Sequence, residues 1–312
     1  MRYVVAGCAG FIGFHLTERL LNEGNEIVGV DDLSTGQSAN ATDLKKHKNF
    51  TWVEHDIVNP VKVSGPVDIV YNLACPASPA DFFPRRLKIL DVCSRGVWNL
   101  LDLAREKGAR LLHTSTSEVY GDPKEHPQKE TYWGNVNPIG DRACYDEGKR
   151  FAEALIVNYR KQHGVKARMA RIFNTYGPRM RTDDGRVLPN FVTQAMEGKP
   201  LTVHGDGGQT RSFCYVSDMA DGLIRLANSE VEDPVNIGNP QEITIREFAE
   251  EIIRLCGSKS TLMSVERPKD DPHVRKPDIT RARTLLGWEP KVDRKEGLAR
   301  TVAWFKENYK PS

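Results

Sequence analysis

Hydrophobic residues in the first half of the chain gather in short continuous runs, which longer amphipathic segments separate. Such runs are typical of strands buried on both faces, so six strands are predicted, at residues 2–6, 26–30, 50–53, 68–74, 110–114 and 166–172. Apolar residues three and four positions apart predict helices over about 11–23, 87–107 and 145–163. Strands that alternate with helices predict an α/β fold with a doubly wound parallel sheet.

The pattern changes after residue 172, where prolines and glycines divide the chain into short elements. Two amphipathic helices are expected there, near 217–229 and over 244–256, and a charged loop over 268–277. We therefore predict a larger domain over 1–173, to which a segment near 215–240 returns, and a smaller region over 174–312.

The composition excludes several classes of function. Of the 312 residues, 39% are hydrophobic and 28% are charged, and the net charge is +2, which predicts an ordinary globular protein without a nucleic-acid or membrane partner. The six cysteines show no C-x-x-C and no Cys/His spacing typical of zinc, so we expect no metal and reduced thiols in a cytoplasmic protein. The first predicted strand begins almost at Met1 and no apolar run has the length of a membrane span, so no signal peptide or anchor is expected.

A glycine-rich loop, GCAGFIG at residues 7–13, follows the first strand and opens the first helix. Glycines at this place let the backbone approach a pyrophosphate, and the helix N-terminus supplies N–H donors and positive potential. The loop therefore predicts a bound dinucleotide, with contacts from Gly7, Gly10, Phe11, Ile12 and Gly13.

The second predicted strand ends in Asp31 and Asp32. An acid at this position accepts hydrogen bonds from the adenosine ribose and repels a ribose phosphate, which favours NAD over NADP. Further cofactor contacts are expected past the third and fourth strands, from Asp56, Ile57, Leu73, Ala74 and Cys75. Asp56 fits an exposed loop acid nearly as well.

Candidate catalytic residues lie downstream of the nucleotide loop. Tyr145 and Lys149 are four residues apart on a predicted helix, so they share one face of it. A nearby ammonium favours phenolate over phenol, which makes Tyr145 a candidate base near neutral pH. The segment STSE at 115–118 closes the fifth predicted strand, at the sheet edge where ligands bind in such folds.

Four longer runs narrow the prediction: STSEVYGDP at 115–123, YWGNVNPIG at 132–140, RACYDEGKR at 142–150 and RIFNTYGPR at 171–179. Together with shorter matches at 184–187, 209–211 and 275–278, they resemble the UDP-glucuronate decarboxylases, also called the UDP-xylose synthase family, within the extended short-chain dehydrogenase/reductase superfamily. The likeness covers essentially the whole chain. It implies a Rossmann domain that binds NAD over 1–173 and a mainly UDP-sugar-binding region over 174–312.

The resemblance implies oxidation of the sugar at carbon 4, in which Tyr145 takes the hydroxyl proton, Lys149 supports the phenolate and Thr116 bonds the same oxygen. The resulting β-keto acid loses carbon dioxide, and reduction gives UDP-xylose; release of the 4-keto pentose stays open. Glu118 and Arg211 are further catalytic candidates. Glu118 either opposes the substrate carboxylate or orients water or the carbon 4 hydroxyl, and Arg211 either clamps the carboxylate or relays a proton.

The resemblance also assigns residues to the UDP-sugar. The set near the sugar is Pro76, Ala77, Ser78 and Glu118, and the set around UDP is Asn174, Arg179, Val187, Asn190, Thr202, His204, Arg211 and Arg275. Arg179 fits an ordinary loop cation equally well, and His204 fits a histidine packed in a strand. A homodimer is implied, with the helices near 87–107 and 145–163 on its two-fold axis.

Three positions depart from related sequences. Ser117 stands where the related 4,6-dehydratases have aspartate, and serine is a poor acid for a leaving hydroxyl, which disfavours dehydration. Cys93 replaces an asparagine that usually helps to set the active-site hydrogen bonds, and Cys8 replaces a glycine, which matters only if its φ is positive. The alternatives are a nucleotide-sugar 4-epimerase or 4,6-dehydratase, and a non-catalytic NAD-sensing protein on the same fold.

Overall fold

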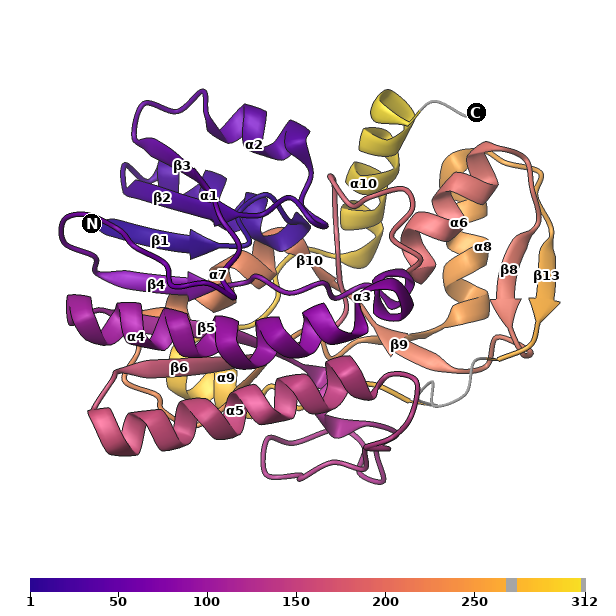
Figure 1. Ribbon diagram of the computed structural model, residues 1–312. Helices are drawn as coiled ribbons and strands as arrows, with labels where there is room; N and C mark the ends of the chain where they lie inside the picture. Colours follow the sequence, from indigo (N-terminus) through magenta and orange to yellow (C-terminus); the bar gives the residue numbers. More distant parts are fainter. Residues whose placement is uncertain (268–273, 310–312) are drawn as a thin grey trace.

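Seven parallel strands form the central sheet of the computed structural model, which describes residues 1–267 and 274–309 (Figure 1). Their order across the sheet is β11-β6-β5-β4-β1-β2-β3. The strands are β1 (Arg2–Ala6), β2 (Glu26–Asp31), β3 (Phe50–Glu54), β4 (Ile69–Asn72), β5 (Arg110–Thr116), β6 (Ala167–Ile172) and β11 (Val235–Ile237). The predicted doubly wound parallel sheet is confirmed. The chain order reverses between β1 and β4, which is the place where open α/β sheets bind ligands.

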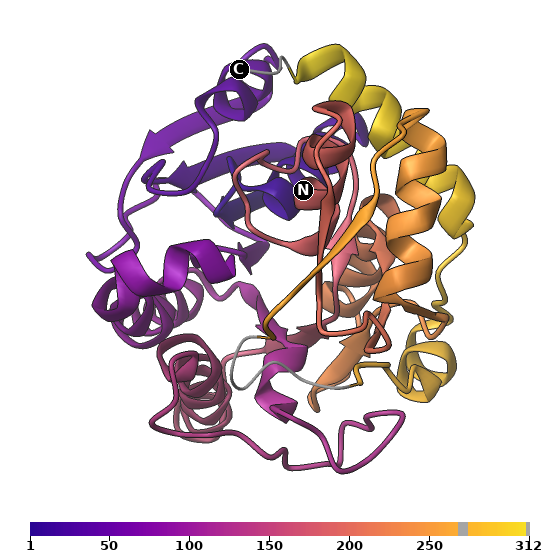
Figure 2. The same ribbon diagram turned by 90° about the vertical axis from the view of Figure 1, so that its right-hand side faces the viewer.

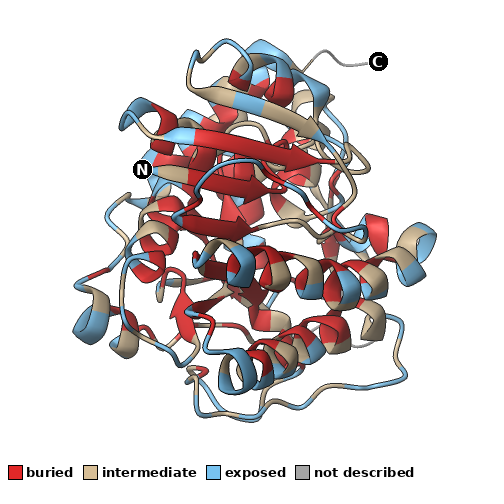
Figure 3. Cartoon of the chain, turned by 60° about the vertical axis from the view of Figure 1, so that its left-hand side comes forward, coloured by how far each residue is buried: buried red, intermediate tan, exposed pale blue. Residues whose placement is uncertain are grey.

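Helices cover both faces of this sheet. They are α1 (Phe11–Asn22), α2 (Ser38–Leu44), α3 (Pro79–Asp91), η1 (Val92–Gly96), α4 (Val97–Lys107), η2 (Ser117–Tyr120), α5 (Ala143–His163), α7 (Val216–Ala227) and α9 (Thr280–Leu286). Successive residues of β1 face opposite ways, so Tyr3 and Val5 pack with α1 and α7, whereas Val4 packs with α4 and α5. Figure 3 shows the result, with buried strands between helices whose outer faces are exposed.

The helix predicted over 87–107 begins earlier than expected. Ser78 caps α3 by accepting a hydrogen bond from the Ala80 N–H, and Pro79 occupies the first helical position, where the missing N–H has no effect. Pro84 hides this start in the sequence, and the backbone bends after it at Arg85 (φ −130°). The π-helical η1 then joins α3 to α4. Expecting the helix to start at residue 87 was therefore wrong.

The second half of the chain builds a smaller layer beside the carboxyl ends of the sheet strands (Figure 2). Its elements are β7 (Thr175–Tyr176), α6 (Val187–Met196), β8 (Leu201–His204), β9 (Thr210–Ser212), β10 (Cys214–Tyr215), β12 (Glu242–Thr244), α8 (Ile245–Cys256), β13 (Leu262–Val265) and α10 (Arg294–Asn308). A capping box between Thr244 and Glu247 starts α8. The apolar faces of α6, α8 and α10 share one hydrophobic cluster, which holds this layer together.

The predicted division of the chain at residue 173 stays a prediction. The large sheet includes β11, from the segment that we expected to return to it, and the separate cluster around Phe248 lies after residue 173. Most of the predicted charged loop, residues 268–273, lies outside the described residues. No helix in the described part of the chain is long and apolar enough to cross a membrane.

Candidate active site

A cavity of about 700 Å³ lies where the carboxyl ends of the sheet strands meet the smaller layer. Its walls combine the glycine loop, the end of β5, the start of α5, and residues of α6, β8 and β9. A smaller cavity adjoins it at the ends of β2 and β3. Together they offer a concave space large enough for a nucleotide cofactor and a second ligand.

The glycine loop is shaped by close backbone contacts. Gly7 has a φ of +83°, and a Cβ built on it would lie 2.7 Å from the backbone nitrogen of Ala74. A Cβ on Gly13 would lie 1.9 Å from the carbonyl oxygen of Gly7, so neither position accepts a side chain. Among the described non-glycine residues, positive φ occurs only at Leu33 and Arg179, so Cys8 is not strained. Gly10, Phe11 and Ile12 at the start of α1 line the large cavity, so the positive end of this helix faces a space that can hold an anion.

The acids after β2 have different partners. Asp31 accepts hydrogen bonds from the N–H groups of Ala9 and Leu33, both at 2.9 Å, so it braces the glycine loop. Asp32 accepts from the Ser34 N–H at 3.0 Å and lies 3.2 Å from the Lys88 ammonium. Lys88 also pairs with Asp56. Sequence analysis missed Lys88, because no local pattern links α3 to acids that precede it by thirty residues or more.

Tyr145 and Lys149 lie on the buried face of α5 at the cavity wall. The Lys149 ammonium donates a hydrogen bond to the Thr114 carbonyl at 2.9 Å, and its nitrogen is 5.8 Å from the centre of the Tyr145 ring. Tyr145 also stacks on Phe82. Burial raises the pKa of Tyr145 to about 12, although the Lys149 charge and a hydrogen bond with Thr116 act in the opposite direction. Within the protein alone, the phenol is therefore the stable form.

Glu118 is held by two arginines at the start of η2. Both oxygens of its carboxylate accept hydrogen bonds from Arg275, one of them at 2.9 Å from Nη2, and Nη2 of Arg142 donates at 2.7 Å. Burial acts to raise the pKa of Glu118, but the charges of Arg275 and Arg142 outweigh it and hold the pKa at about 2. Glu118 is therefore an anion at neutral pH. Arg275, which we expected around UDP, pairs with Glu118 at the cavity wall.

Arg142 and Asp146 were missed by sequence analysis. Arg142 lines the cavity and lies over the Phe82 ring, 5.6 Å from its centre. Its Nε is 3.8 Å from Asp146. Burial and the nearby Glu118 raise the pKa of Asp146 to about 7. A signal for Arg142 was present, because it precedes Tyr145 by three residues and a helix brings such residues to one face.

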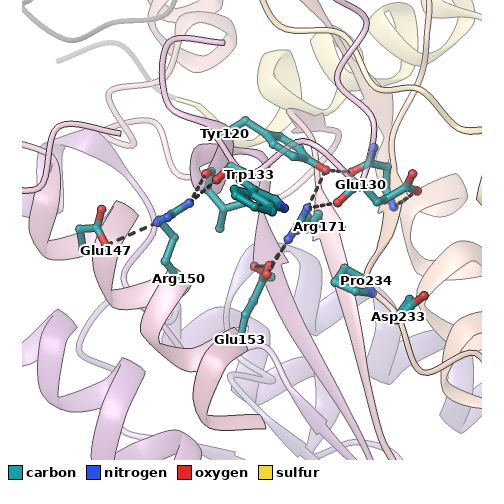
Figure 4. Close-up of polar contacts among 12 residues, drawn as sticks. Tyr120, Glu130, Trp133, Glu147, Arg150, Glu153, Arg171, Asp233 and Pro234 are labelled. Atoms are coloured by element: carbon teal, nitrogen blue, oxygen red, sulfur yellow. Dashed lines mark hydrogen bonds and ion pairs between the residues drawn. The ribbon is translucent and has the colours of Figure 1, made fainter. Parts of the chain in front are cut away.

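The turn that carries Glu118 is fixed by a polar network (Figure 4). Glu153 of α5 accepts two hydrogen bonds from Arg171 of β6, at 2.9 and 2.7 Å. Arg171 in turn donates to the Tyr120 hydroxyl at 3.1 Å and to the Glu130 carbonyl at 3.0 Å. Arg150 donates to the Val119 carbonyl at 3.1 Å. This network binds η2 and the following loop to the sheet.

Most residues predicted for the sugar and UDP reach these cavities. Those that line the large cavity are Ala77, Ser78, Glu118, Asn174, Val187, Asn190, Thr202, His204, Arg211 and Arg275, and Pro76 lines the small one. Arg179 does not line either cavity, because its guanidinium donates to Asn40 at 3.0 Å and to Asp43 at 2.7 Å. Arg181 and Arg186, from the same segment, line the large cavity instead.

The predicted catalytic and cofactor residues are also brought together. Thr116, Tyr145, Lys149, Glu118 and Arg211 line the large cavity, as do Phe11, Ile12 and Gly13. Asp31, Asp32, Asp56, Ile57 and Ala74 line the small one, and Gly7, Gly10, Leu73 and Cys75 border both. A glycine loop, a Tyr-Lys pair and a charged Glu-Arg pair therefore surround one continuous space.

Comparisons with known proteins agree with this arrangement of residues. A family model described as GDP-mannose 4,6 dehydratase matches residues 4–301. UDP-glucuronic acid decarboxylase 5 of Arabidopsis thaliana is 53% identical over 299 residues, which are 96% of this chain and 87% of that protein. UDP-glucuronic acid decarboxylase 1 of Xenopus tropicalis is 51% identical over 306 residues, 98% of this chain and 72% of that protein. The crystal structure of a UDP-glucuronic acid 4-epimerase from Bacillus cereus, with UDP-glucuronic acid and NAD, has a TM-score of 0.87 at 27% identity and covers 99% of this chain and 100% of its own.

Proposed function

The chain belongs to the family of the UDP-glucuronic acid decarboxylases, and on that basis we propose that it converts UDP-glucuronate to UDP-xylose with the help of NAD. The observation that carries the proposal is the meeting of Tyr145, Lys149 and Glu118 with the glycine loop in one cavity. A tyrosine base beside a nucleotide site suits transient oxidation of a sugar, and the oxidised uronate loses carbon dioxide readily.

The residues around the glycine loop fit a dinucleotide. The backbone at Gly7 and Gly13 leaves no room for side chains, and the N-terminus of α1 borders the cavity. Asp32 and Asp56 share the single charge of Lys88, so the adenosine side keeps a net negative charge, which favours NAD over NADP. When bound, NAD+ supplies the hydride acceptor for carbon 4 and returns the hydride after decarboxylation.

The side chains at the end of β5 and the start of α5 support the proton steps. Tyr145 takes the proton of the carbon 4 hydroxyl, and Lys149 stabilises the resulting phenolate through its charge. The new ketone lies β to the carboxylate, so breaking the carbon 5–carbon 6 bond sends the electron pair toward the carbon 4 oxygen. Hydrogen bonds from Tyr145 and Thr116 to that oxygen stabilise the enolate. A proton from water then adds to carbon 5 and restores the ketone, and the Tyr145 proton returns to the carbon 4 oxygen at the final reduction.

Glu118 and Arg211 act near the substrate carboxylate. Glu118 is ionised, so it cannot donate a proton, and its charge opposes a second carboxylate unless the arginines separate the two. Loss of carbon dioxide relieves this repulsion. Arg211 lines the same cavity and is permanently charged, which makes it a clamp for the carboxylate or the diphosphate.

The UDP part is expected in the smaller layer. Thr202 and His204 of β8 line the cavity and are candidates for the uracil, while Arg186 and Arg211 supply positive charge for the diphosphate. Arg179 is less suited to this role, because it lines neither cavity and its guanidinium is held by Asp43. This assignment agrees with the proposed domain roles, in which residues 1–173 bind the cofactor and residues 174–312 bind mainly UDP.

Dehydration and 4-epimerisation share the first oxidation with this reaction. Ser117, which lines the cavity before Glu118, offers no acid for a leaving hydroxyl, so dehydration is disfavoured. The epimerase match at 27% identity is far weaker than the decarboxylase matches. A non-catalytic NAD-sensing role is disfavoured by the complete set of Tyr145, Lys149 and Thr116 in the cavity.

We also infer a homodimer and a cytoplasmic location. Helices α3, α4 and α5 lie side by side and expose large apolar side chains, of which Leu87 is 78%, Trp98 50% and Phe151 52% exposed. An apolar face of this kind suits a two-fold interface between copies. Sedimentation analysis of the wild type and of Trp98→Glu tests it; two copies in the wild type and one in the variant are expected, and a monomeric wild type contradicts it. The location rests on the cysteine pattern of the sequence.

The proposed reaction is tested by incubating the cofactor-loaded protein with UDP-glucuronate and following carbon dioxide and the sugar product by NMR. We expect carbon dioxide and UDP-xylose in equal amounts; a 4-keto pentose in its place would show that the last reduction is skipped. UDP-glucose serves as the control substrate, since it has no carboxylate. Turnover of UDP-glucose with UDP-glucuronate inert would reject decarboxylation and favour an epimerase.

A further inference from the structure

Two thiols that exchange neither proton nor hydride in the proposed reaction lie against each other beside Tyr145. The sulfur atoms of Cys75 and Cys93 are 3.7 Å apart. Cys75 follows β4 and lines both cavities, whereas Cys93 is buried in η1. We propose that Cys75 and Cys93 form a modification site, a dithiol that hydroperoxides oxidise to a disulfide. The disulfide inactivates the enzyme by displacing the neighbouring Tyr145 and Lys149.

Cys93 is packed directly under the catalytic turn of α5. It shares a small apolar cluster with Phe82 and Tyr145. A Cβ built on Gly148, the residue before Lys149, would lie 3.3 Å from the Cys93 sulfur. A disulfide requires a sulfur separation of about 2 Å, so closing the pair shifts one or both cysteines by more than an ångström in a tightly packed place. Such a shift disturbs the packing of Cys93 against Tyr145 and against the turn before Lys149.

The two thiols have different reactivity. A hydrogen bond with Cys93 and the charge of Lys149 lower the pKa of Cys75 to about 7, although burial opposes the shift. The same contact with Cys75, together with burial, raises the pKa of Cys93. Cys75 is therefore the thiol of the pair that more readily forms a thiolate near neutral pH, and it is also the thiol that borders the cavity. Thiolate character and access to solvent are the two conditions for oxidation by peroxides.

The oxidation consumes one molecule of hydroperoxide for each pair of thiols. The Cys75 thiolate attacks the terminal oxygen and becomes a sulfenic acid, and the oxygen–oxygen bond breaks with release of an alcohol, or of water if the oxidant is hydrogen peroxide. The sulfur of Cys93 then attacks the Cys75 sulfur and displaces its hydroxyl group as water. The two thiols are oxidised to one disulfide, and the peroxide is reduced. A thiol reductant reverses the change.

The test compares wild type, Cys93→Ser and Cys256→Ser after treatment with hydrogen peroxide. Cys256 is a half-buried cysteine of α8 in the smaller layer and serves as the matched control. Free thiols are alkylated, the protein is digested with trypsin, and the peptide masses are measured by mass spectrometry. Arg85, Arg86 and Lys88 lie between the two cysteines, so trypsin separates them unless a disulfide joins them. Turnover and bound NAD are measured on the same samples.

We expect a cross-linked peptide containing Cys75 and Cys93 in the wild type and in Cys256→Ser, together with a loss of turnover of at least tenfold that dithiothreitol restores. Cys93→Ser should form no such peptide and should keep its own turnover after the same exposure. Finding both thiols free after oxidation would contradict the proposed site. Oxidation of Cys75 to a sulfinic acid without cross-linking would contradict it as well. Full turnover by fully cross-linked protein would show that the disulfide does not impair Tyr145.

A second measurement does not depend on the folding of any variant. Phenylarsine oxide bridges two neighbouring thiols without oxidising them, so one equivalent should protect both Cys75 and Cys93 of the wild type from alkylation. If both cysteines remain open to alkylation, the proposed dithiol is wrong. These peptide measurements read the thiols directly, so they stand whether or not UDP-glucuronate proves to be the substrate.

Discussion

The charge balance around Tyr145 decides whether the residue acts as a base. Its pKa of about 12 reflects burial, and Lys149, although close and fixed to the Thr114 carbonyl, offsets only part of that effect. A further positive charge in the cavity is needed to make the phenolate at neutral pH, and the nicotinamide ring of oxidised NAD carries one. We therefore expect the phenolate to form when oxidised NAD is bound.

Replacing Lys149 should move the pH dependence of turnover. The active form of Tyr145 is the phenolate, so the rate rises with pH through the pKa of this residue and then levels. Lys149→Met removes the charge that lowers this pKa, and we expect the rising limb to shift upward by about 1–3 units. Lys149→Arg keeps the charge and should shift the limb much less. The measurement is the pH dependence of the single-turnover rate. An unchanged rising limb in Lys149→Met would contradict the assignment of Tyr145 as a base that Lys149 supports.

Arg142 is expected to position Glu118 for the reaction. Arg142→Gln removes one of the two guanidinium groups on this carboxylate and should lower kcat/KM by roughly 10- to 100-fold, the effect of losing one charge-assisted hydrogen bond of about 1.5–3 kcal/mol. Arg86→Gln is the matched control, because Arg86 pairs with the exposed Asp141 and lies over the Phe83 ring, without contact to Glu118. Equal losses in both variants would point to a general charge effect.

Asp146 should make the protein less stable as the pH rises. Its pKa is about 7 in the folded protein and 3.8 as a free side chain, so the folded state favours the protonated form. The associated stability is complete below pH 3.8 and is lost as the pH rises through about 7. Asp146→Asn should therefore gain Tm relative to wild type between pH 4 and 8, by about 2 °C or more. Asp141→Asn, at an exposed acid, is the control, and a pH-independent difference for Asp146→Asn would show that this carboxyl is not perturbed.

At the scale of elements, the site depends on a few strand and helix ends held in fixed positions. Gly108 and Gly164 end α4 and α5 in left-handed conformation, as their place after amphipathic segments predicts. Helices α2, α6, α9 and α10 were not predicted. Helices α2, α6 and α9 have only 7, 10 and 7 residues, and α10 has 15 residues but a weak apolar pattern. The π-helical η1 has no signal that separates it from the helices on either side, yet it carries Cys93.

The network beneath η2 offers a test at this scale. Glu153→Gln breaks a nearly buried pair with Arg171, so we expect a loss of about 2–4 kcal/mol in the free energy of unfolding and a lower kcat. Glu147→Gln, on the same helix, affects only a half-exposed pair with Arg150 at 3.5 Å and should change neither quantity appreciably. Denaturant unfolding and turnover are measured on both variants. Similar behaviour of the two would mean that the network does not hold the Glu118 turn.

At the scale of the whole molecule, the sequence was sufficient for most of the sheet and for the family. The six predicted strands and the decarboxylase likeness are confirmed, whereas the seventh strand, β11, was not predicted. The pairing of Arg275 with Glu118 was not predictable, because 157 residues separate them and only the folded smaller layer brings them together. The same reason applies to Arg179, whose partner Asp43 lies 136 residues away. Local motifs thus identified the chemistry, and tertiary contacts decided which charges remain for the substrate.

Transient oxidation at carbon 4 is the central claim, and the most direct test uses UDP-glucuronate with deuterium on that carbon, turned over by the cofactor-loaded protein. We expect release of carbon dioxide with the deuterium retained on carbon 4 of the UDP-xylose, because the hydride leaves and returns without exchange with solvent. Tyr145→Phe should bind NAD but release carbon dioxide at least about 100-fold more slowly. Loss of the deuterium to water, or decarboxylation at an undiminished rate in Tyr145→Phe, would contradict the account.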